Sequence, residues 1–109
     1  MTMARKKLDT LTEQMYYLLL ALHAPGHGYA IMERVREITD GRLQIGPGTL
    51  YTLLGRFESE GLIRLNYSED KKRKIYSLTD LGRQMLEQEY QRLRRLVADG
   101  GAIFGKEDA

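Results

Sequence analysis

Four consecutive basic side chains form the densest cluster of charge in the chain: Lys71, Lys72, Arg73 and Lys74. Ammonium and guanidinium groups attract phosphates and donate hydrogen bonds to them, so such a cluster suits a nucleic-acid backbone. Residues 62–68 and 73–78 have the alternation of strands, and the polar residues between them predict a tight turn. The cations are therefore expected at a hairpin tip. Lysine on an exposed strand also prevents sheet addition, and both roles are compatible.

The segment before this hairpin predicts a helix with a polar outer face. Pro47 suits a first helical turn, where its missing N–H has no partner. The apolar residues at helical spacing define an inner face of Leu50, Leu53, Leu54 and Phe57. The outer face, which has no acid before Glu58, then consists of Thr49, Tyr51, Thr52, Gly55, Arg56 and Ser59.

An outer face without early carboxylates fits a helix that lies in the major groove of DNA, because an acid in its first turns would repel the phosphates. Gly46 and Gly48 would let a phosphate approach the free N–H groups at the helix start. Taken alone, the same face is also typical of an ordinary solvated helix. Its position just before a cationic hairpin favours nucleic-acid binding.

Other residues that could support chemistry lack the partners it would need. His23 and His27 have the spacing of a helical metal pair, but Pro25 and Gly26 break the helix between them. The chain has no cysteine, and no nucleophile-elbow context surrounds its serines, Ser59, Ser68 and Ser77. We therefore expect no enzyme activity, no metal site and no cofactor.

Length and charge limit the organisation of the chain. Its 109 residues suffice for one domain with a modest core. The net charge is only +2, so the basic residues matter through their clustering. No apolar run approaches the roughly 20 residues that span a bilayer, and the first residues are too short and polar for a secretory signal. The expectation is a cytoplasmic protein without a membrane partner.

The remaining elements follow from period and end signals. Residues 10–13 fit a capping box with Thr10 as the N-cap of a first helix, and a second helix is expected over 29–39, with Ile31, Val35 and Ile38 as its inner stripe. The order of helices and hairpin predicts a mainly α (α+β) fold, a winged helix-turn-helix with a two-stranded wing. We expect a flexible basic arm over 1–9, a DNA-binding domain over 10–80, a dimerisation helix over 81–98 and a loose tail over 99–109.

The last predicted helix is longer than a small core can cover. About 18 residues of helix span roughly 27 Å, and an apolar stripe runs along it through Leu86, Tyr90, Leu93 and Val97. We expect part of this stripe to contact a second subunit. A homodimer would place two recognition helices about one DNA turn apart, as a palindromic operator requires.

Four sequence motifs resemble the PadR family of bacterial transcription regulators: GY at 28–29, GTLY at 48–51, ESEGLI at 58–63 and RKIYSLTDLGR at 73–83. The resemblance covers most of the chain, and the length is similar to that of the short subfamily. It implies that Tyr29, Thr49 and Tyr51 lie at the DNA surface, with Lys72 and Arg73 on the wing.

The resemblance also implies a function. Members of the family are mostly dimeric repressors that small aromatic or drug-like effectors release from DNA. An effector pocket could use Tyr16, Tyr17 and Tyr90, although these residues fit a core or an interface better. The alternative is a winged helix that binds only proteins, which would have no need for four adjacent cations.

Overall fold

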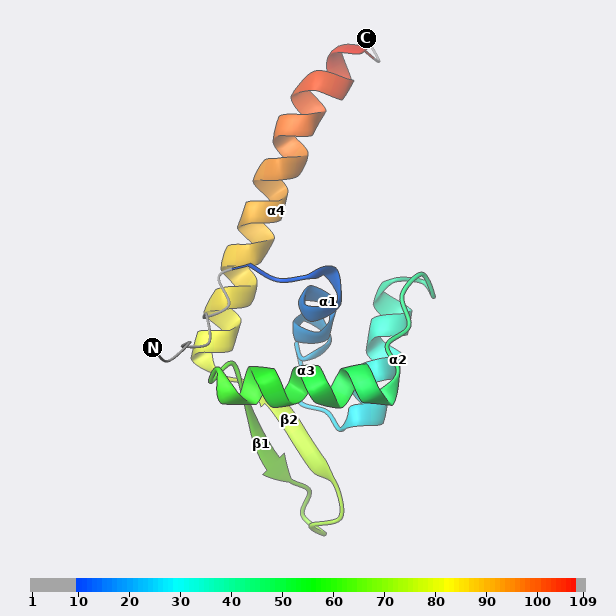
Figure 1. The fold of residues 1–109 in the computed structure, drawn as a ribbon, viewed down its shortest axis with the longest axis vertical. Helices are drawn as coiled ribbons and strands as arrows, with labels where there is room; N and C mark the ends of the chain where they lie inside the picture. The colour runs from blue at the N-terminus through cyan, green and yellow to red at the C-terminus, as the bar shows by residue number, and fades with distance from the viewer. Residues whose placement is uncertain (1–9, 108–109) are drawn as a thin grey trace, which may run out of the picture.

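The computed structural model describes residues 10–107, which form four helices and one two-stranded sheet (Figure 1). The elements follow one another as α1 (Glu13–Ala21), α2 (Gly28–Ile38), α3 (Pro47–Ser59), β1 (Ile63–Tyr67), β2 (Lys74–Leu78) and α4 (Asp80–Glu107). This order confirms the mainly helical α+β class and the winged helix-turn-helix. The predicted basic arm, 1–9, lies outside the described residues.

The core lies between α1, α2 and α3, and the sheet contributes Ile63 and Tyr76 to it. Its fully buried side chains include Leu18, Leu19, Ile31, Val35, Leu50, Leu54 and Phe57. Ile38 was expected in the inner stripe of α2, but it is 44% exposed. Thr39 takes that core position, because it follows Val35 by four residues and its hydroxyl donates to the Val35 carbonyl at 2.9 Å.

The first helix begins differently from the prediction. Thr12 is the N-cap, and its Oγ1 accepts a hydrogen bond from the Met15 N–H at 3.2 Å. The predicted capping box with Thr10 as N-cap is therefore wrong. The reason is a tertiary contact: Leu11 is buried, and its N–H donates to Glu89 on α4 at 2.7 Å, so the chain turns into the helix only afterwards.

The wing is an antiparallel hairpin whose register pairs Ile63 with Leu78 and Tyr67 with Lys74. It is tied to the turn between α1 and α2 through two backbone hydrogen bonds. The Gly26 N–H donates to the Tyr76 carbonyl at 3.0 Å, and the Tyr76 N–H donates to the Gly26 carbonyl at 2.9 Å. Gly26 thus forms an isolated antiparallel β-bridge with β2.

Thr79 alone separates β2 from α4. Its Oγ1 donates to the Gly61 carbonyl at 2.6 Å and accepts from the Gly82 N–H at 3.0 Å, which caps α4. A Cβ atom on Gly82 would collide with the Leu62 carbonyl, so this close approach needs glycine. The wing and α4 are therefore joined without a linker.

The last helix extends far beyond the domain (Figure 1), and its 28 residues span about 42 Å. The prediction that 99–101 end it, leaving a loose tail, is wrong, because α4 continues to Glu107. Gly100 and Gly101 are helical, and each costs roughly 1 kcal/mol relative to alanine. Since no proline follows them, the helix propagates through this weak point.

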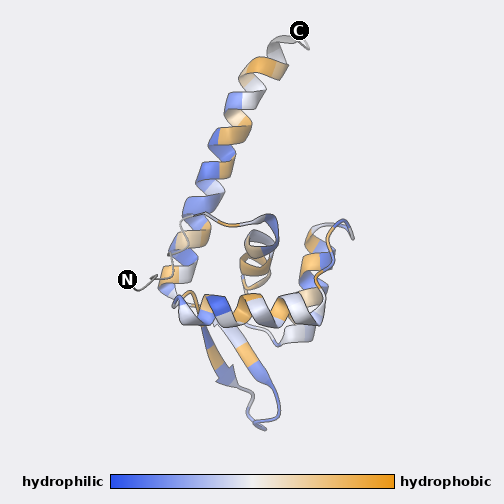
Figure 2. Cartoon of the chain, viewed as in Figure 1, coloured by the Kyte–Doolittle hydropathy of each residue, from blue (hydrophilic) through white to orange (hydrophobic). Residues whose placement is uncertain are grey.

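Hydrophobic bands recur along α4 beyond the part that packs on the domain (Figure 2). They are formed by exposed large side chains: Leu96, Val97, Ile103 and Phe104. Over the described residues, no helix combines the length and apolar character that crossing a membrane would require.

Candidate nucleic-acid interface

The outer face of α3 is open to solvent where the sequence places its polar residues. Thr49, Tyr51 and Thr52 are exposed, and no acid occurs in the first turn. The N-cap, Gly46, makes no side-chain capping bond. A Cβ atom on Gly46 or Gly48 would meet nothing within 4 Å. The first-turn N–H groups of α3 can therefore be approached by an anion, as the helix dipole favours.

Tyr51 connects α3 with the start of α2. Its phenolic oxygen lies so close to Gly28 that a Cβ atom on Gly28 would collide with it. The ring is nevertheless 52% exposed, and Tyr29, the next residue of α2, is 66% exposed. The glycine of the GY motif is thus required by the tyrosine of the GTLY motif, and this contact fixes where the Tyr51 side chain lies.

Arg56 is less open than predicted. It was placed on the outer face of α3, but the structure shows a half-buried residue. Its Nε is buried and has no hydrogen-bond partner among the described residues. Arg56 therefore lies at the edge of the exposed face, with part of its side chain under its neighbours.

The four cations of the wing tip are all exposed, and none forms an ion pair within the described part of the chain. The turn that carries them is held by Asp70, which accepts from the Lys72 N–H at 3.0 Å. The Ser68 hydroxyl, the Lys72 N–H and the nearby Arg73 lower the pKa of Asp70. Asp70 is thus used by the backbone of the turn, while the four cations are exposed to solvent.

Sequence reasoning missed two exposed residues of β1, Arg64 and Tyr67, the latter 60% exposed. The alternation of the strand could have identified Arg64, since its neighbours Ile63 and Leu65 turn inward. Tyr67 lies near the buried Tyr76: burial raises the pKa of Tyr76, and the nearby Tyr51, Glu58 and Tyr67 raise it further. Groups on α3 and on the wing therefore both influence Tyr76.

The predicted dimer stripe on α4 has two parts. Leu86 packs against the core of its own domain, and Leu93 is half-buried. Tyr90 is 46% exposed and Val97 is 74% exposed. The exposed part of the predicted stripe therefore begins at Tyr90, and exposed apolar side chains continue past the predicted helix end to Phe104, which is 66% exposed.

A surface hollow of about 380 Å³ lies where α1 meets this stripe, lined by Tyr16, Tyr90, Leu93, Arg94, Val97 and Ala98. Burial raises the pKa of Tyr16, and Tyr90, Tyr17 and Glu89 contribute. The Arg94 guanidinium stacks 5.8 Å from the centre of the Tyr90 ring. Tyr17 packs edge-on against Tyr16 at 5.8 Å and is outside the lining.

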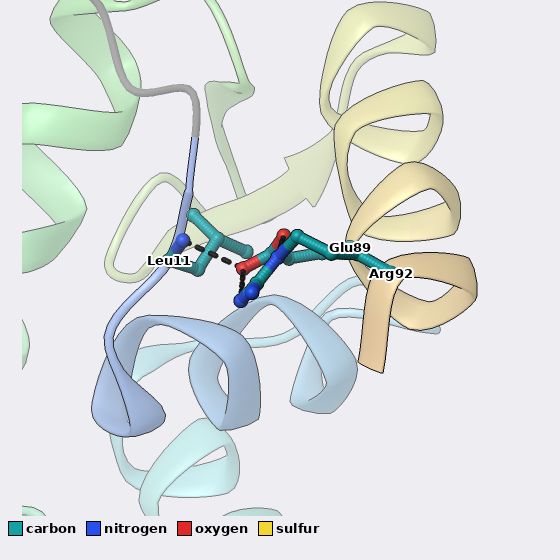
Figure 3. Close-up of polar contacts among 3 residues, drawn as sticks. All are labelled: Leu11, Glu89 and Arg92. Atoms are coloured by element: carbon teal, nitrogen blue, oxygen red, sulfur yellow. Dashed lines mark hydrogen bonds and ion pairs between the residues drawn. The ribbon is translucent and has the colours of Figure 1, made fainter. Parts of the chain in front are cut away.

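A buried carboxylate that the sequence reasoning did not single out joins α4 to the start of α1 (Figure 3). Glu89 is 4% exposed and accepts hydrogen bonds from the Leu11 N–H at 2.7 Å and from Arg92 at 2.6 and 3.0 Å. The Arg92 hydrogen bonds, with that of Leu11, hold the pKa of Glu89 below its usual range despite burial. Arg92, although partly exposed, is thus tied to this contact.

The two histidines have separate surroundings. His23 is exposed, whereas His27 is the N-cap of α2, and its Nδ1 accepts from the Ala30 N–H at 3.3 Å. Within residues 10–107, no group of three or more His, Cys, Asp or Glu side chains is placed to hold a metal ion.

Comparison with known proteins points to one family. The profile described as "Transcriptional regulator PadR-like family" matches residues 17–88. An uncharacterized 37.1 kDa protein in a Streptomyces fradiae transposon is 37% identical over 97 residues, which cover 89% of this chain and 26% of that protein. The chain therefore spans about a quarter of this relative's length.

Two solved structures are also similar. A PadR family transcription regulator from Clostridium difficile is 30% identical, with a TM-score of 0.70 over 83% of this chain and 95% of that one. Bacillus subtilis PadR, in complex with operator DNA, is 25% identical, with a TM-score of 0.62 over 71% of this chain and 46% of that one. The family is one of regulators rather than of enzymes. The resemblance inferred from the four motifs is confirmed, and the chain belongs to the PadR-like family of transcriptional regulators.

Proposed function

We propose that this chain is a cytoplasmic, dimeric and sequence-specific DNA-binding repressor that a small aromatic effector releases. The observation that carries the proposal is the exposed face of α3, which has no acid before Glu58, together with four exposed cations on the wing. The similarity to Bacillus subtilis PadR, whose structure contains operator DNA, supports the same mode of binding.

In this proposal the N-terminal half of α3 enters the major groove. Thr49 and Thr52 donate or accept hydrogen bonds at base edges, and Tyr51 lies beside them, fixed by its contact with Gly28. The open first turn at Gly48 receives a phosphate. The further DNA contacts are proposed for Tyr29, Arg56, Lys71, Lys72, Arg73 and Lys74.

The wing supplies the part of the affinity that does not depend on sequence. Each phosphate that a lysine or arginine neutralises releases counterions, so log K falls by about 0.9 per contact for each unit of log salt. Cations at a hairpin tip can contact the phosphates of a DNA backbone without contacting its bases. We assign this role to the four residues of the wing tip.

The second copy is proposed to dock on α4. Exposed large apolar side chains occur from Tyr90 to Phe104. They belong to the part of α4 that projects from its domain (Figure 1). Burying a large apolar side chain contributes about 1.5–3 kcal/mol, so burial of these residues on each subunit favours the contact. Leu86 and Leu93, predicted for the same interface, lie at its inner edge.

The effector site is proposed in the hollow between Tyr16 and Tyr90. A volume of about 380 Å³ falls in the range of small-molecule pockets, and its aromatic walls suit a flat ligand. Because Tyr90 and Val97 also belong to the proposed dimer surface, a ligand bound there would contact both subunits and could change their relative orientation.

The experiment that tests the proposal is a footprint on DNA upstream of the chain's own gene, followed by salt titration. Wild-type protein is expected to protect two related half-sites. The double variant Lys72→Ala with Arg73→Ala should bind all duplexes more weakly and lower the salt slope by about 0.9 for each contact removed. The matched control removes two charges from α4, Arg83→Ala with Arg95→Ala, and should keep the slope.

The outcomes separate the alternatives. Failure to bind any duplex in dilute buffer would refute DNA binding and favour a winged helix that contacts proteins only. Binding with an unchanged slope in the wing variant would remove the wing from the interface. An unregulated or activated promoter in cells would contradict repression while leaving DNA binding intact.

A further inference from the structure

Arg34 holds the turn between α1 and α2 in a way that the DNA-binding proposal does not use. Its Nη1 donates to the carbonyls of Ala21 at 3.1 Å and Ala24 at 2.7 Å, and its Nη2 donates to the Pro25 carbonyl at 3.1 Å. The side chain is half-buried and forms no ion pair with a described carboxylate. Its charge lies at the C-terminal end of α1, where the helix dipole favours a cation.

The turn that Arg34 holds is the point to which the wing is attached. Gly26 directly follows Pro25, and Gly26 and Tyr76 exchange two backbone hydrogen bonds. Tyr76 is 5% exposed and lies two residues after Lys74, the last cation of the wing tip. A continuous path thus runs from the guanidinium through Pro25 and Gly26 into β2.

The contact between the guanidinium and Gly26 is tight. A Cβ atom on Gly26 would lie 2.9 Å from Nη1 and 3.2 Å from Cζ of Arg34. Because the φ of Gly26 is outside the left-handed region, alanine is compatible with its backbone. An added methyl group would therefore displace the far end of the Arg34 side chain without removing any charge.

We infer that Arg34 is a positioning residue for DNA binding, which sets the angle of the wing relative to α3 without touching DNA. The inference rests on the proposed function. A two-stranded hairpin is marginally stable alone, so its direction depends on what its base is packed against. Lys72 precedes Tyr76 by four residues, of which Lys74 and Ile75 belong to β2, so the tip lies up to about 14 Å from Tyr76. Over that length a tilt of about 10° moves the tip by roughly 2 Å, enough to break a hydrogen bond.

The first test is Arg34→Lys, which keeps the positive charge. One ammonium nitrogen cannot replace the two nitrogens with which the planar guanidinium reaches its three carbonyls. We expect about tenfold weaker binding to the footprinted duplex at low salt and a slope lower by roughly one phosphate contact. The matched control is Arg36→Lys, on the exposed side of the same helix, which should leave both values unchanged.

The second test is Gly26→Ala, which acts on the same contact from the other side. It should reproduce the loss of slope, and combining it with Arg34→Lys should add little, because both remove one contact. Arg34→Lys should also lower the slope less in the wing double variant than in the wild type, because that variant has already lost the phosphate contacts of Lys72 and Arg73. If circular dichroism shows that Arg34→Lys lowers the folded fraction, Gly26→Ala provides the test of the same contact instead.

A purely structural role would predict something else. The melting temperature of Arg34→Lys would fall, and its folded fraction would bind DNA with the wild-type slope. That result, or a wild-type slope in Gly26→Ala, overturns the inference. Failure of the wild-type protein to bind any duplex would instead refute the proposed function, so the two failures are distinguishable.

Discussion

Replacing Glu89 with glutamine should destabilise the protein at neutral pH and have little effect in acid. The carboxylate is 4% exposed and accepts hydrogen bonds from Leu11 and, bidentately, from Arg92 (Figure 3). Glutamine has nearly the same shape and can still accept from the Leu11 N–H, but it loses the charge that binds Arg92. Hydrogen bonds to charged groups contribute about 1.5–3 kcal/mol, and the partial exposure of Arg92 favours the lower end.

A loss of about 2 kcal/mol corresponds to a melting temperature lower by roughly 10 °C for a domain of this size. The assay is thermal unfolding followed by circular dichroism, at one fixed protein concentration because a dimer's stability depends on concentration. The matched control is Glu87→Gln, an exposed acid on the same helix, which should shift the melting temperature by less than about 2 °C.

The pH dependence provides the sharper check. The folded-state pKa of Glu89 is lowered, chiefly by Arg92. Its stabilisation is therefore fully present above the unfolded-state value, near 4.5, and is lost as the pH falls through the folded-state pKa. The difference between wild type and Glu89→Gln should shrink below that pH, since a protonated glutamate resembles glutamine. A difference that stays constant into acid would refute the assignment of the stabilisation to the charge.

Two further changes test the helix contacts. Val97→Asp should yield monomers in analytical sedimentation with an unaltered fold, because Val97 is 74% exposed within one chain. The control Gln88→Asp, at another exposed position of α4, should stay dimeric. A Val97→Asp variant that is still dimeric would place the interface elsewhere. Gly28→Ala should cost about 1–3 kcal/mol in denaturant unfolding, because its methyl group meets the Tyr51 hydroxyl. Adding Tyr51→Phe should restore part of the loss, and a lack of any rescue would show that another contact is responsible.

The architecture could be predicted because its signals are local. The change of period from 3.6 to 2 after Gly61 identified the wing, and the apolar spacing of α3 identified which residues face out. The N-cap of α1 could not be predicted in the same way. It depends on a hydrogen bond from Leu11 to Glu89, 78 residues away, which no local pattern contains.

The end of α4 shows a different limit. Asp99, Gly100 and Gly101 have the composition of a helix stop, yet the helix continues through them. Glycine lowers helix propensity without forbidding the conformation, whereas proline removes a hydrogen bond and clashes. A stop signal made of glycine is therefore weaker evidence than one that includes proline.

The candidate site was predictable at the level of exposure. The positions of Thr49, Tyr51 and Thr52 follow from helical geometry, but the partial burial of Arg56 depends on what packs beside it. Arg34 was not identified at all, because its partners are backbone carbonyls and leave no mark in the sequence. Side chains that act on backbone groups are the class that pattern reading finds least easily.

The direct junction between β2 and α4 has a consequence for how such a protein can be tuned. Thr79 is the only residue between them, and its hydroxyl is hydrogen-bonded to Gly61 and Gly82, so the orientation of α4 is coupled directly to that of the wing. In a dimer joined along α4, adding or deleting one helical residue between Asp80 and the dimer contact would rotate the DNA-binding domain by about 100° relative to that contact. Only insertions or deletions close to a whole number of helical turns would keep both DNA-binding domains facing the same side of a DNA duplex. The length of this segment of α4 is therefore constrained.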